Sequence, residues 1–148
     1  MSFKDTFKDF VFKNFDAKVI VSSEPLVVVL KAHLIFESLL DKLLEQYIPD
    51  QEFYKDLNLK FYKKLELIRK NKIIDSKLYK IVKRLNEIRN DFVHKLDLNF
   101  EDVNIDLFTD LVSEDTKSDP RWSMIDKKEK FGICIHYFLG YSTQFVKE

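Results

Sequence analysis

The sequence predicts an all-α protein, folded as a single helical bundle of five to six helices over residues 1–148. Apolar residues recur at spacings of three and four along most of the chain, which is the period of helices with one buried face. The chain has only 2 Gly and 3 Pro, too few for the many turns of a β-sandwich. It is 45% hydrophobic and contains 14 Phe, so it can build one aromatic-rich core.

The N-terminal part predicts two helices. Residues 1–20 are expected to form an amphipathic helix that packs on the domain, with one apolar face made of Phe3, Phe7, Phe10 and Val11. Its polar side mixes both charge signs, which disfavours a helix lying on a membrane surface. The second helix should start at residues 22–25, where two serines, an acid and a proline are typical start signals, and end before Pro49. Its broad apolar side predicts a central helix.

The remaining helices are predicted from the same periodicity. They cover residues 57–70, 76–96, 101–112 and 125–146. Asp75 or Ser76 should cap the helix over 76–96. Gly132 and Gly140 lie inside the last helix, where glycine costs stability, so close approach of another helix is the expected reason. Residues 113–120, SEDTKSDP, predict a mobile loop.

Composition limits the classes of function. The net charge of zero argues against a protein that coats nucleic acid with its whole surface. The single cysteine, Cys134, excludes an internal disulfide and a cysteine-based zinc site, and its apolar neighbours predict a buried thiol. We find no signal peptide and no apolar run approaching the ~18 residues of a membrane span, so a cytoplasmic protein without a membrane partner is expected.

The charge is unevenly distributed along the chain. Residues 55–84 contain 11 Lys and Arg against 3 Asp and Glu, a local charge of +8, whereas residues 97–120 contain 1 Lys against 8 Asp and Glu, a local charge of −7. Two interpretations are open. The segments are solvated helix faces that attract each other, or the basic one steers a phosphate backbone toward the helix over 76–96.

The motif whose side chains are best suited to catalysis is RNDFVH, residues 89–94. Arg89 offers a permanent charge and a fork of donors that fits a phosphate. His94 can move a proton near neutral pH, and Asn90 adds an amide beside both. Together Arg89 and His94 could hold and cleave a phosphodiester without a metal. Lys80, Lys83 and Arg84 precede them on the same helix, as candidate RNA-steering charges.

Helix geometry leaves the role of this motif open. On a regular helix Arg89 falls within the apolar stripe, and about 140° separates it from His94. The guanidinium of Arg89 and the imidazole of His94 would come together if the helix end loosens or if the long arginine side chain bends around the helix. Alternatively, a second copy of the domain could complete the site. In the structural alternative, Arg89 forms a buried ion pair with Glu37, and His94 is a polar residue near the helix end.

Other candidate sites carry weaker signals. His33 and Glu37 share a helix face at a spacing of four, which could hold a metal, but two ligands do not make a zinc site and HExxH is absent. We therefore favour a structural role for this pair and predict no metal. His136 lies in the apolar last helix and is expected to be a core histidine. Phosphate loops and other cofactor motifs are absent, so no cofactor is expected.

LNEIRNDFVHKL resembles the R-x4-6-H signature of the HEPN superfamily of small helical bundles. The likeness continues in AHLIFESLLDKLLEQY, FYKKLELIRKNKIID, NFEDVNIDLFTDLV and KFGICIHYFLGYSTQF, so it covers about residues 30–145 and looks most like the mannitol-repressor-like branch. Catalytic members are metal-independent endoribonucleases, many of them toxins or defence effectors, and they dimerise so that arginine and histidine from two protomers line one cleft.

The resemblance implies roles for three residues. Arg89 would bind the scissile phosphate, His94 would act as general base or acid, and Asn90 would orient the histidine or the phosphate, giving a 2′,3′-cyclic phosphate. The implied partners are a second copy of the chain, RNA and an antitoxin or other regulatory protein. Leu96 stands where some toxin members carry the tyrosine of an H-x-Y motif. Two alternatives are open: a non-catalytic regulator resembling the mannitol operon repressor, and a nucleotide-binding helper whose Arg89 grips a phosphate without cleaving it.

Overall fold

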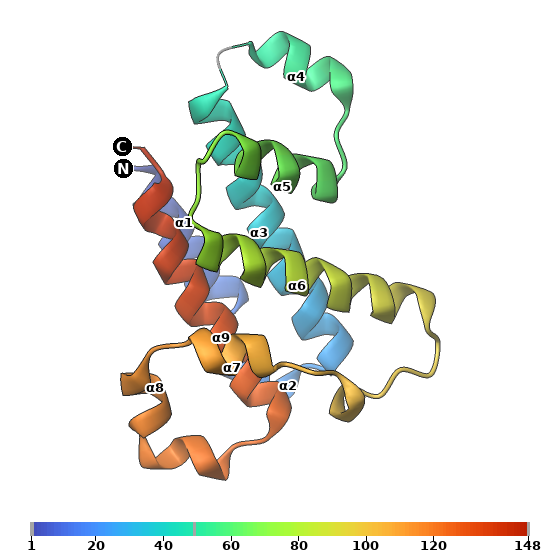
Figure 1. Cartoon of the computed structure of the whole chain (residues 1–148). Helices are drawn as coiled ribbons and strands as arrows, with labels where there is room; N and C mark the ends of the chain where they lie inside the picture. Colours follow the sequence, from blue (N-terminus) through green and yellow to red (C-terminus); the bar gives the residue numbers. More distant parts are fainter. Residues whose placement is uncertain (1, 49, 148) are drawn as a thin grey trace.

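The computed structural model describes residues 2–48 and 50–147, with the backbone alone at residues 51, 53 and 54. All regular secondary structure in this part of the chain is helical (Figure 1). This confirms the all-α fold class. The α-helices are α1 (Phe3–Asn14), α2 (Ala17–Ser22), α3 (Pro25–Tyr47), α4 (Gln51–Leu57), α5 (Phe61–Lys70), α6 (Ser76–His94), α7 (Asp106–Leu111), α8 (Glu114–Ser118) and α9 (Lys127–Ser142). Short 3₁₀ turns cover Phe100–Asp102, Pro120–Met124 and Thr143–Phe145.

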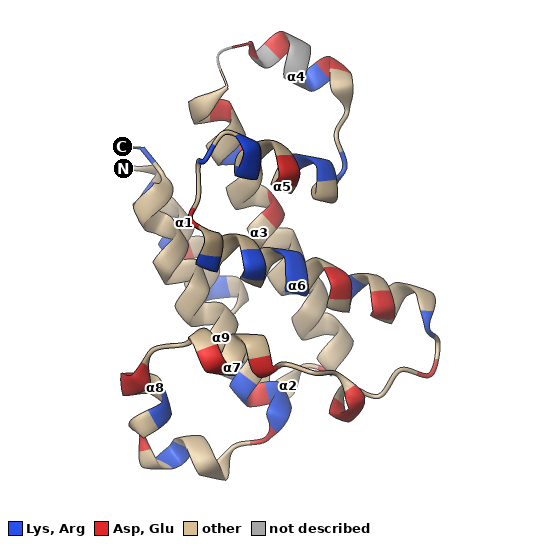
Figure 2. Cartoon of the chain, in the orientation of Figure 1, with Lys and Arg blue, Asp and Glu red and all other residues tan. Residues whose placement is uncertain are grey.

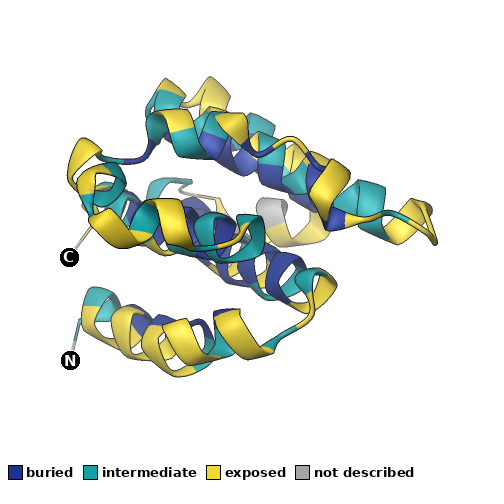
Figure 3. Ribbon diagram, turned by 90° about the horizontal axis from the view of Figure 1, so that it is seen from below, coloured by how far each residue is buried: buried dark blue, intermediate teal, exposed yellow. Residues whose placement is uncertain are grey.

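Helix α3 is the centre of the core, as its broad apolar side predicts. It packs against α5, α6 and α9, and the buried positions of the helices face one another while the exposed positions lie outside (Figure 3). The core also takes in Phe7 and Val11 from α1, so the N-terminal segment packs on the rest of the chain. Cys134 is fully buried, as predicted, and burial raises the pKa of its thiol to about 12.

Three short helices, α2, α4 and α8, were not predicted. Residues 1–20 form two helices rather than one, because Asp16 caps α2 by accepting the backbone N–H of Val19 at 2.9 Å. The predicted mobile loop over 113–120 contains α8, where Ser113 accepts the N–H of Thr116. Helices of five to seven residues are too short to display the 3.6-residue period, so sequence periodicity cannot detect them.

Several predicted boundaries of longer helices also differ from the structure. Helix α5 begins at Phe61 instead of residue 57, and α9 covers Lys127–Ser142 instead of 125–146. Helix α3 begins at Pro25 with Glu24 as its N-cap, and no side chain makes the capping hydrogen bond there; Ser22 instead ends α2. The predicted helix over 101–112 is reduced to the 3₁₀ turn at Phe100–Asp102 followed by α7. By contrast α6 runs as a regular helix from Ser76 through His94, two residues short of its predicted end.

The two glycines of α9 have different surroundings. A Cβ on Gly132 would lie 2.5 Å from the Cγ2 of Ile20, so α2 approaches α9 as closely as the sequence suggested. A Cβ on Gly140 would meet nothing within 4 Å, so the predicted close approach is wrong at this position.

These surroundings predict opposite effects for one substitution. Gly132→Ala forces Ile20 to move, and the overpacking cost of roughly 1–3 kcal/mol exceeds the gain in helix propensity, for an expected net loss of about 1 kcal/mol in unfolding free energy. Gly140→Ala should instead gain about 0.5–1 kcal/mol. Urea denaturation of both variants checks this, and equal changes in the two proteins would contradict the close contact between α2 and α9.

Candidate functional site

Helix α6 carries the whole RNDFVH motif and is firmly held at its start. Asp75 caps it by accepting the backbone N–H of Leu78 at 2.9 Å, and the same carboxylate accepts a hydrogen bond from the hydroxyl of Tyr141 on α9. The hydrogen bond to Asp75 raises the pKa of Tyr141 to about 12. The apolar row of α6 then packs on α3 and α5, which fixes the direction in which Arg89 projects.

An open, polar hollow of about 640 Å³ lies where α3, α5, α6 and the link over 58–60 meet. Arg89 and Asn90 line it, whereas His94 does not. The other lining residues are His33, Glu37, Asn58, Leu59, Lys60, Phe61, Tyr62, Lys64 and Asn86. The hollow therefore combines charged groups, amides and an imidazole, and we take it as the candidate site.

Arg89 has few partners within this hollow. One terminal nitrogen, Nη1, donates to Oδ1 of Asn90 at 3.1 Å, and the Nε nitrogen is buried without a hydrogen-bond partner among the described residues. Glu37, the predicted structural partner of Arg89, pairs instead with Lys64, whose Nζ lies 3.5 Å from its carboxylate. The described contacts contain no ion pair between Arg89 and Glu37, so the guanidinium keeps unused donors.

His94 is the exposed last residue of α6, outside the hollow. Helix α6 is regular up to this residue, so the helix end does not loosen. The side chains of Arg89 and His94 therefore still point about 140° apart around the helix axis. The structure therefore places Arg89 and Asn90 in one hollow, but a single protomer does not place His94 there with them.

The imidazole in the hollow is that of His33, which is 6% exposed. Its Nε2 donates to Oδ1 of Asn86 at 3.0 Å, and its ring stacks on Phe61 with centroids 4.1 Å apart. Burial lowers the pKa of His33, the nearby charge of Arg89 lowers it further, and the Asn86 hydrogen bond and Glu37 oppose the shift. These contacts fit the predicted structural role. The described residues contain no group of three potential metal-ligating side chains.

The lowered pKa of His33 predicts a pH-dependent stability. The neutral imidazole is favoured in the folded state, so its contribution is fully present above pH 6.5 and is lost as pH falls through the lower folded pKa. Below pH 6.5 the unfolding free energy of the wild type should therefore fall more steeply than that of His33→Gln. Denaturant midpoints between pH 7 and pH 5 test this, with His136→Gln as the control on an exposed histidine. Parallel curves for all three proteins would contradict it.

The three predicted steering residues have different surroundings. Lys80 and Lys83 are exposed, whereas Arg84 donates to the backbone oxygen of Asn104 at 2.8 Å and pairs with Glu87 at 3.2 Å. Arg84 thereby ties α6 to the segment over 97–120 through a backbone carbonyl, while its ion pair with Glu87 lies within α6. Lysine and arginine gather on α5 and on the first half of α6, whereas acidic residues interrupt them in the half of α6 that carries the motif (Figure 2).

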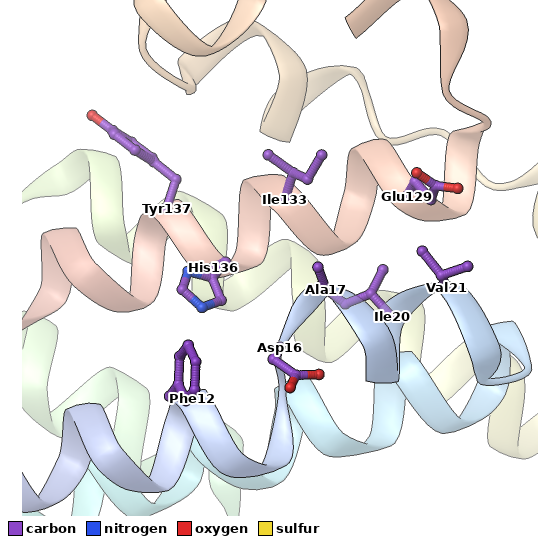
Figure 4. Close-up of a pocket in the computed structure, with 9 residues that line it drawn as sticks. All are labelled: Phe12, Asp16, Ala17, Ile20, Val21, Glu129, Ile133, His136 and Tyr137. Carbon is purple, nitrogen blue, oxygen red and sulfur yellow. The ribbon is translucent and has the colours of Figure 1, made fainter. Parts of the chain in front are cut away.

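A second cavity, of about 480 Å³, lies between α1, α2 and α9 and is mostly apolar (Figure 4). His136 is on its wall above Phe12, and this histidine is exposed rather than in the core as predicted. Position 136 falls on the side of α9 that faces the gap, which the nearly uniform apolar character of the helix conceals. The cavity lacks the cluster of donors that surrounds Arg89.

No family model, curated protein or solved structure matches this chain. In the part of the chain that the structure describes, no helix is both long and apolar enough to cross a membrane.

Proposed function

We propose that the protein is a metal-independent endoribonuclease of the HEPN type, with its active site in a cleft between two protomers. The observation that carries the proposal is the state of Arg89. Its guanidinium lies in a polar hollow, makes one hydrogen bond to a neutral amide and leaves a buried nitrogen unpaired. A buried donor without a partner costs stability, so this guanidinium is poorly satisfied by the protein, and its terminal nitrogens are the donors that fit a phosphate.

The proposed chemistry needs one cation and one proton carrier. Arg89 binds the scissile phosphate and stabilises the charge that develops on it. Asn90, which already accepts a hydrogen bond from Arg89, holds the orientation of the guanidinium. The imidazole of His94 takes the proton from the ribose 2′-hydroxyl, whose oxygen attacks phosphorus as the bond to the 5′-oxygen breaks. The leaving 5′-oxygen takes a proton from a water molecule, and His94 returns its proton to the hydroxide that this leaves. The products are a 2′,3′-cyclic phosphate and a 5′-hydroxyl.

A second copy of the chain supplies the convergence that one protomer lacks. Val93, next to His94, is 48% exposed, and Leu96 just beyond the helix is fully exposed. A two-fold contact at this end of α6 would remove both apolar side chains from water. A two-fold contact through this end of α6 would bring His94 of one protomer to the Arg89 hollow of the other, with Lys80 and Lys83 as flanking cations.

Mixing two inactive variants tests the composite site. Arg89→Met and His94→Ala should each be inactive alone, yet a 1:1 mixture that has exchanged subunits should recover up to about a quarter of wild-type cleavage. This follows because half of the dimers are mixed and each of these keeps one intact Arg–His pair out of two. A mixture as inactive as its components, at a concentration where sedimentation shows dimers, would contradict a site shared between protomers.

The zero net charge and the same exposed apolar residues favour one alternative, a non-catalytic regulator like the mannitol-repressor-like branch. Such a protein would use the end of α6 to bind another protein, and Arg89 would serve the fold. Dimers that neither bind nor cleave RNA would favour this alternative.

A further inference from the structure

A groove runs along α9 beside α1 and α2, and we call it the α9 groove. It consists of the cavity of about 480 Å³ described above and a neighbouring hollow of about 340 Å³. Phe12 of α1 and His136 of α9 line both parts, and Figure 4 shows their rings facing one another across the gap. Residues of α9 from Glu129 to Tyr137 line the first part, and residues from His136 to Thr143 line the second. The two hollows are therefore neighbouring parts of one surface.

The α9 groove exposes apolar side chains between walls that are helices. Phe12 is 70% exposed and Val21 is 55% exposed, and both line the first hollow. Apolar side chains gathered in a concave surface with polar residues at its rim are typical of a protein-binding site. The backbone groups of a helical wall are already hydrogen-bonded within the helix, so the groove offers no edge to an extended peptide. A helix satisfies its own backbone groups and can pack its side chains against such walls.

The spacing of the two hollows matches the spacing of apolar residues on one face of a helix. The residues of α9 that line the hollows are centred near positions 133 and 140, which are roughly 10 Å apart at ~1.5 Å per residue. Two residues seven apart on an amphipathic helix lie on the same face and are separated by about the same distance. Two apolar side chains of a bound helix can therefore enter the two hollows together.

Gly140 leaves room for a helix to approach the backbone of α9. It is exposed and lines the second hollow, and a Cβ there would meet nothing within 4 Å. The described residues therefore give no reason for a glycine here, although glycine is unfavourable inside a helix. Gly132 shows the same contact within the chain, because Ile20 of α2 packs directly on it. A bound helix would place an aliphatic side chain on Gly140 in the same way.

The charges of the lining indicate the chemistry of this helix. Asp9, Asp16 and Glu129 line the α9 groove, against the single lysine Lys8. Lys8 and Asp9 belong to the second hollow, so the first hollow has two carboxylates and no lysine or arginine. Opposite charges across an interface favour association and set its orientation. The partner should therefore carry Lys or Arg at the end that lies beside Asp16 and Glu129.

We propose that the α9 groove binds an amphipathic helix of a partner protein. Two apolar side chains, seven residues apart, fill the two hollows, one of them against Gly140. Lysine or arginine beside the first of these side chains faces Asp16 and Glu129. This site is separate from the Arg89 hollow, with which it shares no lining residue.

Selection from a displayed library of random peptides, as long as the 16-residue helix α9, tests the proposal with the full-length protein as target. Selected peptides should carry apolar residues at helical spacing, with pairs seven residues apart, and more Lys and Arg than Asp and Glu. Fluorescein-labelled copies, followed by polarisation, give the dissociation constants. A proline placed in the middle of a selected peptide should weaken binding at least about tenfold, because it interrupts a helix.

Variants of the groove locate the bound peptide. Gly140→Leu fills the second hollow and Phe12→Ala removes part of the apolar wall, so each should weaken binding at least about tenfold, the scale of a central interface residue. Glu129→Gln should weaken binding only about threefold, because exposed ion pairs contribute little. The matched control is Lys63→Leu, which adds an exposed leucine to α5 outside the groove and should bind like the wild type. Thermal melts verify that each variant folds.

Several results would overturn the proposal. They are a selection that yields no binding peptide, selected peptides without helical spacing or rich in Asp and Glu, and binding that Gly140→Leu and Phe12→Ala leave unchanged. Sedimentation distinguishes another occupant: a wild-type dimer that Gly140→Leu dissociates would show that a second copy of the chain covers the groove, in place of a partner helix.

Discussion

Replacing Arg89 with methionine is expected to reduce RNA cleavage by about 10²–10³-fold while leaving the protein folded. The activity falls because the donors that stabilise charge on the phosphate are removed. Stability should change by less than about 1 kcal/mol, because the guanidinium makes one hydrogen bond to a neutral amide and its loss strands no carboxylate. Methionine fills similar space along the buried stem.

Initial rates and thermal melts of the same preparations measure these two effects. Arg121→Met is the control, because Arg121 is exposed and pairs with Asp119 away from the hollow. A stability loss of about 3 kcal/mol or more would show that Arg89 forms a buried ion pair whose removal leaves an unpaired charge. That result would contradict the assignment of Arg89 to phosphate binding.

His94→Ala should reduce cleavage at least about 10²-fold, the usual scale for a general acid–base group. The side chain is exposed at the end of α6 and has no partner among the described residues, so the unfolding free energy should change by no more than about 0.5 kcal/mol. Loss of activity without loss of stability is therefore the expected signature. Rates at pH 7 and urea denaturation of one preparation give both quantities.

His136→Ala is the matched control, since His136 is also exposed but lies on α9. It should cleave like the wild type. Equal rates for wild type, His94→Ala and His136→Ala would mean that no imidazole at the end of α6 takes part, and would remove His94 from the mechanism.

The parts of the fold that the sequence could predict are those with a long periodic pattern. The central helix, the helix that carries the motif and its Asp75 cap all follow from spacing and capping chemistry. The short helices were missed because five to seven residues show no period. Gly132 and Gly140 look alike in the sequence, and only the position of Ile20 distinguishes them.

The candidate site was predictable only in part, for a similar reason. The wheel position placed Arg89 within the apolar stripe of α6, and in the structure the residue is half-buried with its Nε enclosed. The partner of His33 is Asn86, 53 residues away, and a spacing rule within one helix cannot reveal such a contact. Glu37 was a reasonable partner for Arg89 by charge, but Lys64 on α5 lies within reach of the same carboxylate.

Metal-independent RNA cleavage through the motif on α6 can be tested by incubating the purified protein with a mixed single-stranded RNA pool in excess EDTA. The new ends of the fragments are then identified. We expect 2′,3′-cyclic phosphate and 5′-hydroxyl ends, formed by the wild type and at least about 10²-fold more slowly by His94→Ala. Intact RNA after incubation with the wild type, or equal cleavage by the two proteins, would contradict it.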